Sequence, residues 1–224
     1  MAKNSKGSSK GPSKGPSKGP SKGPSKGSRK GSKGNEWADH LTLRAKAENY
    51  PARSVYKLEE IQKKFKVIAP SSQVLDLGCA PGSWLLYAAK QVGSKGQVFG
   101  IDLKSIEIKL PGNVIAIQDN ILSLENNDFL VEGFGVVLSD MAPATTGRKD
   151  VDSFRSFELC RMALETAKKF GAPNSNFVCK IFQGNEFKEF EQAVKLVFRE
   201  CKTFKPESCR KQSKEIYIIA KGKK

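Results

Sequence analysis

The 224-residue sequence predicts an α/β fold: a doubly wound, mostly parallel β-sheet that carries helices on both faces and ends in an antiparallel hairpin. Three observations support this class. Short apolar stretches typical of buried strands alternate with longer segments of helical periodicity from residue 53 onward. A strand-like stretch, a glycine-rich turn and a helix start follow one another at residues 74–84, as they do where an open α/β sheet binds a ligand. The last two strand-like stretches have no helix between them and therefore predict the hairpin.

The first element of this domain is a helix that begins near Arg53, because Val55, Leu58, Ile61 and Phe65 recur on one helical face. Seven strands and three further helices follow, each bounded by turn-forming residues or by a change of periodicity. We expect strands at residues 74–77, 97–101, 113–117, 135–139, 176–182, 201–204 and 215–220, and helices at residues 83–92, 154–170 and 186–199.

The first 34 residues differ from the rest in composition. They contain ten Lys and Arg residues, no acidic residue, and four GPSK repeats between residues 11 and 26. Glycine and proline oppose helix formation, the lysines repel one another, and too few apolar side chains are present to offset the entropy of ordering. We therefore expect residues 1–34 to form a disordered basic tail and residues 35–224 to form a single domain. Such a tail serves either solubility or binding to phosphates, and the uncompensated lysines favour binding.

The charge of the chain indicates a polyanionic partner. The formal net charge is +16, of which residues 35–224 carry +6. RNA or DNA is favoured over lipid, because no apolar run reaches the roughly 18 residues of a membrane span. No secretory signal follows the basic N-terminus, and the five cysteines form no CxxC pair beside the single His40. We expect a cytoplasmic protein without a structural metal.

The turn after the first strand predicts a nucleotide-like cofactor. Its glycines let the backbone approach a ligand closely, and Asp76 is expected to accept hydrogen bonds that shape the turn. Ala80 stands where a dinucleotide fingerprint requires glycine, which argues against a nicotinamide cofactor. Asp102 ends the second strand, where a carboxylate can hold ribose hydroxyls. Residues 119–120 follow the third strand, where an adenine amino group can be bound.

Four polar residues stand in stretches whose neighbours are apolar or turn-forming: RSVYKL, LSDMAP, VCKIFQG and SKEIYIIA. They are Lys57, Asp140, Lys180 and Glu215. Asp140 follows the fourth strand, and Lys180 lies inside an apolar strand, where a lysine is costly unless it faces a cleft and has a partner. Glu215 opens the last strand, and Lys57 requires its helix to pack over the crevice. The alternative for each lysine is a surface residue with a snorkelling stem, which fits Lys57 better than Lys180.

Two lysines with two carboxylates suit the removal of a proton from a weakly acidic hydroxyl. A lysine acts as a base only when it is neutral, which burial and a neighbouring ammonium favour and which carboxylates oppose. The four groups can balance so that one amine titrates near neutral pH. We expect Lys180 to be the base and Lys57 to orient the hydroxyl, with Asp140 facing both lysines and Glu215 positioning the cluster.

The ordered set ARSVYKL, VLDLGCAPGSW, LSDMAPATTG, FVCKIFQG and SKEIYIIA resembles the FtsJ-type (RlmE) ribosomal RNA 2′-O-methyltransferases, from about residue 44 to residue 224. The resemblance implies a Rossmann-like methyltransferase fold that uses S-adenosyl-L-methionine. The implied substrate is a uridine ribose in the A-loop of 23S ribosomal RNA, free or within the large subunit. The family's catalytic Lys-Asp-Lys-Glu tetrad would fall on Lys57, Asp140, Lys180 and Glu215. Its donor-binding positions would fall on Gly82, Trp84, Asp102 and Asp140.

The resemblance further implies in-line methyl transfer from sulfur to the 2′-oxygen, with Asp140 facing the sulfonium. The protein is expected to act as a monomer. Basic residues of the early helix and the last hairpin would hold RNA phosphates: Arg44, Lys46, Arg53, Lys205, Arg210 and Lys211. In IQDNIL, gap-free matching puts Asn120 on the family's adenine-contacting acid and Asp119 on a glycine. Either can accept the adenine amino proton.

Three alternatives compete with this interpretation. The first is a 2′-O-methyltransferase that acts on transfer RNA or on a messenger cap; the compact body without large insertions favours the ribosomal substrate. The second is an inactive RNA-binding module of ribosome assembly, which has no need for a lysine inside an apolar strand. The third is a nicotinamide oxidoreductase, against which Ala80 argues.

Overall fold

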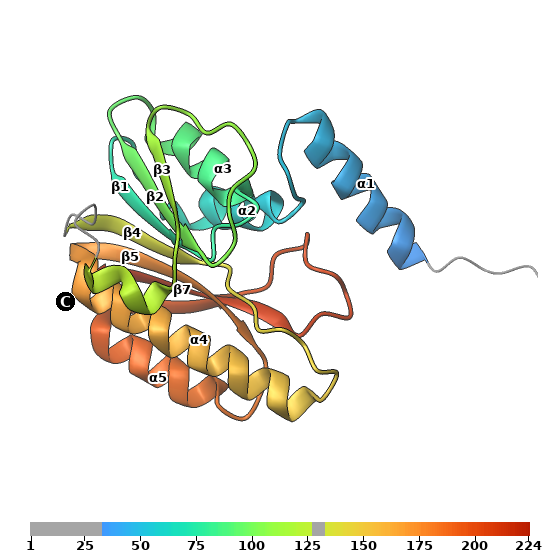
Figure 1. Cartoon of the computed structure of the whole chain (residues 1–224). Coiled ribbons are helices and arrows are strands. Elements are labelled where there is room, and N and C mark those ends of the chain that lie inside the picture. Colours follow the sequence, from blue (N-terminus) through green and yellow to red (C-terminus); the bar gives the residue numbers. More distant parts are fainter. Residues whose placement is uncertain (1–32, 127–132) are drawn as a thin grey trace, which may run out of the picture. The chain divides into compact units, whose positions relative to one another are not determined.

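The computed structural model of the chain describes residues 33–126 and 133–224 (Figure 1). The predicted disordered tail therefore lies outside the described residues up to residue 32. In chain order the elements are α1 (Lys33–Ala47), α2 (Val55–Phe65), β1 (Gln73–Leu77), α3 (Ser83–Val92), β2 (Gln97–Asp102), β3 (Val114–Gln118), the 3₁₀ helix η1 (Ile121–Asn126), β4 (Phe134–Ser139), α4 (Lys149–Phe170), β5 (Gly171–Phe182), α5 (Phe187–Val197), β6 (Phe198–Phe204) and β7 (Glu215–Lys223).

The strands of the described ranges form one seven-stranded sheet in the order β3-β2-β1-β4-β5-β7-β6. Strands β1 to β5 are parallel, and β7 is antiparallel to both β5 and β6. The chain adds β2 and β3 on one side of β1 and then returns to place β4 on its other side. Ligands of open α/β sheets bind at the carboxyl ends of the strands beside such a reversal. In this fold that position lies between β1 and β4.

Helices cover both faces of the sheet (Figure 1). Helices α2 and α3 pack on one face in a cluster that includes Leu58 and Leu85, and α4 and α5 pack on the other in a cluster that includes Phe157 and Phe190. Successive strand residues belong to opposite clusters, because side chains alternate across a strand. The strands are apolar on both faces, as a covered parallel sheet requires. The predicted α/β class is confirmed.

The predicted strands and helices are present, but the end of the chain differs from the prediction. The predicted helix over residues 186–199 ends at Val197, and β6 begins at Phe198. Phe198 is buried, pairs with Lys223 across the hairpin and stacks on Phe177 at 5.7 Å between ring centroids. Strand β5 begins at Gly171, earlier than predicted, because a register shift lets the turn-like GAPNS segment join the sheet beside β4. In both places tertiary pairing overrides the local pattern.

Helix α1 was not predicted, because few of its residues are apolar. Leu41 and Ala45, one turn apart, are its buried side chains among those described, and they join the cluster of α2 and α3. The guanidinium of Arg44 lies 4.4 Å from the ring centre of Tyr56 on α2. Contacts with the domain, and not its own amphipathicity, therefore stabilise α1. Within residues 33–126 and 133–224, none of the helices has the length and apolar character needed to cross a membrane.

Candidate active site

The predicted polar residues gather at the carboxyl edge of the sheet, on the face that α2 and α3 cover. The two-residue period of the strands places them there. Four polar residues in or directly after strands each stand two residues from an apolar residue of that face, in the pairs Val74 and Asp76, Leu138 and Asp140, Val178 and Lys180, and Ile219 and Tyr217. Lys180 and Tyr217 are also direct partners in the antiparallel pairing of β5 with β7. Local alternation and strand register together create the cluster.

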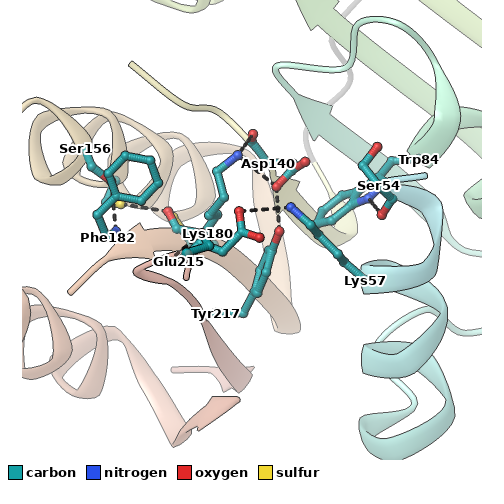
Figure 2. Close-up of polar contacts among 12 residues, drawn as sticks. Ser54, Lys57, Trp84, Asp140, Ser156, Lys180, Phe182, Glu215 and Tyr217 are labelled. Carbon is teal, nitrogen blue, oxygen red and sulfur yellow. Dashed lines mark hydrogen bonds and ion pairs between the residues drawn. The ribbon is translucent and has the colours of Figure 1, made fainter. Parts of the chain in front are cut away.

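Two lysine–carboxylate pairs form its centre (Figure 2). The Lys180 Nζ atom lies 3.0 Å from Asp140 Oδ1 and also donates to the backbone carbonyl of Asp140. The Lys57 Nζ atom donates to Glu215 Oε2 at 3.0 Å. The Tyr217 hydroxyl donates to Asp140 Oδ1 at 2.6 Å, and its ring centre lies 6.0 Å from Lys57 Nζ. The fold thus brings together all four residues that the sequence singled out.

The charges of this cluster support one another. Burial alone would raise the pKa of Asp140, but the ammonium groups of Lys180 and Lys57 and the hydroxyl of Tyr217 outweigh it and lower that pKa. Burial would likewise lower the pKa of Lys57, but Asp140 and Glu215 raise it. These carboxylates therefore favour the charged form of the Lys57 amine, which donates to Glu215. Burial, together with the charge of Asp140, raises the pKa of Tyr217, so the phenol keeps its proton.

The start of α3 holds the segment that leads into α2. The Ser83 hydroxyl donates to the Ala52 carbonyl at 3.0 Å and accepts the Ala52 N–H at 2.8 Å. The Trp84 indole donates to the Ser54 carbonyl at 2.9 Å, and its ring lies 6.0 Å from that of Tyr217 (Figure 2). Trp84 is almost completely buried. Its described contacts are with the protein, and they place Lys57 above the sheet edge.

The glycine turn between β1 and α3 requires glycine at two positions. Gly78 has a φ of 76°, and a Cβ there would lie 2.5 Å from the side chain of Met141, directly after Asp140. Gly82 has a φ of 106° and is the N-cap of α3, and a Cβ there would lie 2.8 Å from the side chain of Ile108. Asp102 shapes this turn, because its Oδ2 accepts the Ala80 N–H at 2.9 Å.

The expectation that Asp76 shapes the turn is wrong. Asp76 is fully buried, and neither of its carboxylate oxygens has a hydrogen-bond partner among residues 33–126 and 133–224. Burial raises its pKa well above the usual value, and the negative charges of Asp140 and Asp102 raise it further. Three carboxyl groups thus meet at the ends of the adjacent strands β2, β1 and β4. This arrangement is unfavourable unless a proton or a cationic ligand offsets it.

Asp119 and Asn120 follow β3, next to Asp102. The Asp119 N–H donates to the Asp102 carbonyl at 2.9 Å, which joins the ends of β2 and β3. The side-chain oxygen of Asn120 accepts the Leu122 N–H at 3.0 Å and so helps to begin η1. One Asp119 oxygen accepts the Asn120 N–H at 2.6 Å. Both residues therefore follow a strand end that adjoins Asp102.

The basic residues predicted to hold phosphates come from two distant segments, and the fold brings one pair together. The Arg53 guanidinium, before α2, lies 3.4 Å from the Ser208 carbonyl in the loop between β6 and β7. Burial and the nearby charge of Arg210 lower the pKa of Arg53. Arg44 is instead engaged with Glu48, at 2.7 Å. The fold therefore places Arg53 beside the loop after β6 and near Arg210.

Tyr217 is the residue of the cluster that the sequence analysis did not single out. It lies in the stretch SKEIYIIA, two residues after Glu215. The period of two alone would have placed it on the same face as Glu215. A buried tyrosine at that position needs a partner for its hydroxyl, and the site supplies Asp140.

These features define a class. A doubly wound sheet that ends in an antiparallel hairpin, a glycine turn at its reversal point, and paired lysines and carboxylates beside that turn are the features of a Rossmann-like methyltransferase. The chain belongs to the FtsJ-like methyltransferase family, which it matches over residues 50–223.

Relatives with assigned roles resemble nearly the whole domain. The ribosomal RNA large subunit methyltransferase E of Desulforapulum autotrophicum is 58% identical over 194 residues, which cover 86% of this chain and 96% of the relative. The protein of the same name from Bdellovibrio bacteriovorus is 44% identical over 191 residues, 83% of this chain and 97% of the relative. A crystal structure from Plasmodium falciparum, assigned as a ribosomal RNA methyltransferase, is 26% identical with a TM-score of 0.68, covering 78% of this chain and 98% of that one.

Proposed function

We propose that this methyltransferase transfers a methyl group from S-adenosyl-L-methionine to the 2′-hydroxyl of a uridine in the A-loop of 23S ribosomal RNA, within the large ribosomal subunit. The observation that carries the proposal is the buried Lys180, only 6% exposed and paired at the sheet edge with Asp140, which also accepts the Tyr217 hydroxyl. The relatives named ribosomal RNA large subunit methyltransferase E support the choice of RNA.

The carboxyl groups at the sheet edge fit the methyl donor. S-Adenosyl-L-methionine carries a sulfonium and an ammonium group, and it supplies a methyl group on positively charged sulfur when bound. Asp76, Asp102 and Asp140 present acidic groups at three adjacent strand ends, and Asp76 has no partner in the described ranges. We assign Asp140 to the side of the sulfonium and Asp102 to the ribose, with Gly82 and Trp84 at the turn.

For the adenine we favour Asp119 over Asn120. The Asn120 side-chain oxygen already accepts the Leu122 N–H, whereas Asp119, which accepts hydrogen bonds from the Asn120 N–H and the Ser123 side chain, has two carboxylate oxygens and therefore the larger acceptor capacity.

The four charged residues would then divide the proton chemistry between them. Lys180 Nζ, in its neutral form, accepts the proton of the 2′-hydroxyl while that oxygen forms its bond to the methyl carbon. Bound S-adenosyl-L-methionine would supply the methyl carbon, and its sulfur would keep the electron pair of the broken carbon–sulfur bond. Lys57 stays charged through Glu215 and donates a hydrogen bond to the hydroxyl oxygen. Asp140 and Tyr217 keep Lys180 in place, so alignment costs little at the moment of reaction.

RNA would be held by the basic surface formed by Arg53 and the loop after β6, with the N-terminal tail, residues 1–34, as an additional arm. Contacts of this kind release counterions, so affinity falls steeply as salt rises. We propose a monomer that works in the cytoplasm, where ribosomal subunits are assembled. A salt-independent affinity would contradict the proposed basic surface.

The direct test is methyl transfer from labelled S-adenosyl-L-methionine to large subunits that lack the modification, with Lys180→Ala as the comparison. Label at a single alkali-resistant ribose, lost in the variant, would establish the reaction. Transfer to transfer RNA or capped messenger RNA instead would retain the chemistry and change the substrate. Cofactor binding without transfer to any RNA would favour the inactive assembly module.

A further inference from the structure

The loop between β6 and β7, residues 205–214, separates its side chains by polarity. Pro206, Ser208 and Cys209 are buried against the domain. Four basic side chains are exposed against a single acidic one, Glu207; the basic residues are Lys205, Arg210, Lys211 and Lys214. The loop therefore presents positive charge outward from a buried underside.

Internal hydrogen bonds give this loop a compact form. The Cys209 N–H donates to the Pro206 carbonyl at 3.1 Å, and the Ser213 N–H donates to the Arg210 carbonyl at 2.9 Å, which makes two consecutive turns. Lys205 Nζ donates to the Ser213 carbonyl at 2.7 Å and closes the ends of the loop. The loop thus behaves as a unit whose orientation depends on what holds it to the domain.

Glu60 on α2 provides that attachment. One of its carboxylate oxygens accepts the Glu207 N–H at 2.6 Å, and the other accepts the Ser208 N–H at 2.9 Å. Hydrogen bonds from backbone N–H groups to a carboxylate are stronger than neutral ones. The remaining polar contact between Arg53 and the loop is long, at 3.4 Å, and neither Arg53 Nη1 nor Ser208 Oγ has a partner in the described part of the chain. Glu60 is therefore the principal polar link between α2 and the first half of the loop, whereas the end of the loop is held by the Gln183 N–H, which donates to the Lys214 carbonyl at 3.0 Å.

The same helix also carries the lysine of the active site. Glu60 stands three residues after Lys57, so the two side chains share one face of α2. Lys57 pairs with Glu215, the first residue of β7 and the residue directly after the loop. The helix thus holds the end of the loop through Lys57 and its beginning through Glu60.

We propose that Glu60 is a positioning residue for RNA: it docks the basic loop against α2, so that the phosphate-binding groups are fixed relative to the ribose at Lys57 and Lys180. This inference rests on the proposed RNA methylation. Glu60 would not touch the reacting atoms. It would reduce the entropy that the loop loses when RNA binds, because the loop is already ordered in the required orientation.

The kinetic test compares Glu60→Ala, Glu60→Gln and the neighbouring control Glu59→Gln. Glu59 lies on the same helix but pairs with Lys63 and, at 3.9 Å, with Arg44, so its replacement removes the same charge without releasing the loop. We expect Glu60→Ala to raise KM for the unmodified subunit about tenfold at unchanged kcat, with S-adenosyl-L-methionine affinity equal to wild type. Glu60→Gln keeps one acceptor and should lie between the two, and Glu59→Gln should match wild type.

Limited trypsin digestion gives a readout that does not depend on activity. Arg210 and Lys211 are exposed cleavage sites inside the loop. Glu60→Ala should be cut there several-fold faster than wild type and than Glu59→Gln, with the domain still intact. Unchanged KM and unchanged cleavage would overturn the positioning role while leaving the proposed function in place. If the wild-type protein methylates no RNA, the proposed function is refuted. Even in that case, a rate of loop cleavage in Glu60→Ala equal to that of wild type would overturn the docking of the loop by Glu60. A fall in kcat without a rise in KM would contradict a role in RNA positioning.

Discussion

Replacement of Lys180 by methionine tests the central assignment most directly. The change keeps the length and apolar volume of a side chain that is only 6% exposed, and it removes the amine. The variant loses the 3.0 Å pair with Asp140 Oδ1 and the hydrogen bond to the Asp140 carbonyl. Everything else in the cluster, including the pair of Lys57 with Glu215, can stay in place.

The loss can be estimated from the geometry. Two unit charges 3.0 Å apart attract by about 5–6 kcal/mol at an effective dielectric constant near 20. The net loss of stability is smaller than this attraction, because Asp140 in the variant still accepts the Tyr217 hydroxyl, still interacts with the charge of Lys57 and can also take up a proton. We therefore expect the free energy of unfolding to fall by about 3 kcal/mol. Loss of a general base should lower kcat by about 10²–10⁴-fold.

The assays are single-turnover methyl transfer to unmodified large subunits, calorimetric binding of S-adenosyl-L-methionine, and chemical denaturation. Lys202→Met on β6 is the matched control, because Lys202 is exposed and lies 4.0 Å from its nearest carboxylate, Glu200. Retention of cofactor affinity with loss of turnover would support the base assignment. A turnover near that of wild type would refute it, and loss of cofactor binding together with turnover would make Lys180 a structural residue.

Three further predictions concern neighbouring groups. Tyr217→Phe removes the 2.6 Å hydrogen bond to Asp140. In the same transfer assay, this variant should have a kcat about tenfold lower than wild type and an unchanged KM for RNA. An unchanged kcat would show that Tyr217 is not part of the site. Asp76→Asn replaces a buried carboxyl group that has no hydrogen-bond partner in the described ranges. Chemical denaturation should therefore find the ligand-free variant at least as stable as wild type, and calorimetry should find weaker binding of S-adenosyl-L-methionine. A large loss of stability would contradict this account. The pKa of Asp140 is lowered on folding, so its contribution to the free energy of unfolding is present above about pH 4 and is lost as the pH falls through the folded-state pKa. In Asp140→Asn, a plot of the denaturation midpoint against pH should therefore be flatter than that of wild type over this acidic range. A plot identical to that of wild type would show that Asp140 is not the titrating group.

Much of the fold follows from local pattern. Apolar stretches of strand length and the helical period from Val55 to Phe65 place most elements within a few residues of their observed bounds. The prediction failed where the sheet overrides this pattern. Phe198 leaves helical periodicity because its ring is buried against Phe177, and the GAPNS segment joins β5 because a register shift accommodates it.

The composition of the candidate active site also follows from the sequence. Burial of a charged side chain costs free energy in any fold unless the charge has a partner. Lys180 lies inside an apolar strand and Asp140 at the end of another, so these positions indicate a shared functional role. Their identity could therefore be predicted before any distance was known. The pairing of each lysine with its own carboxylate could not, because it depends on how β5 and β7 align and on where α2 crosses the sheet edge.

The sequence by itself thus determined the α/β class, the glycine turn and the four charged residues, because alternation, helical period and burial cost act over a few neighbouring residues. The tertiary structure alone decided that Asp102, and not Asp76, holds the turn, that Tyr217 joins Asp140, and that Glu60 holds a loop 147 residues further along the chain. These contacts join segments whose separation is set by strand order and register. Local sequence patterns do not encode that separation, because the same side chains could make the same contacts if more or fewer residues lay between the segments.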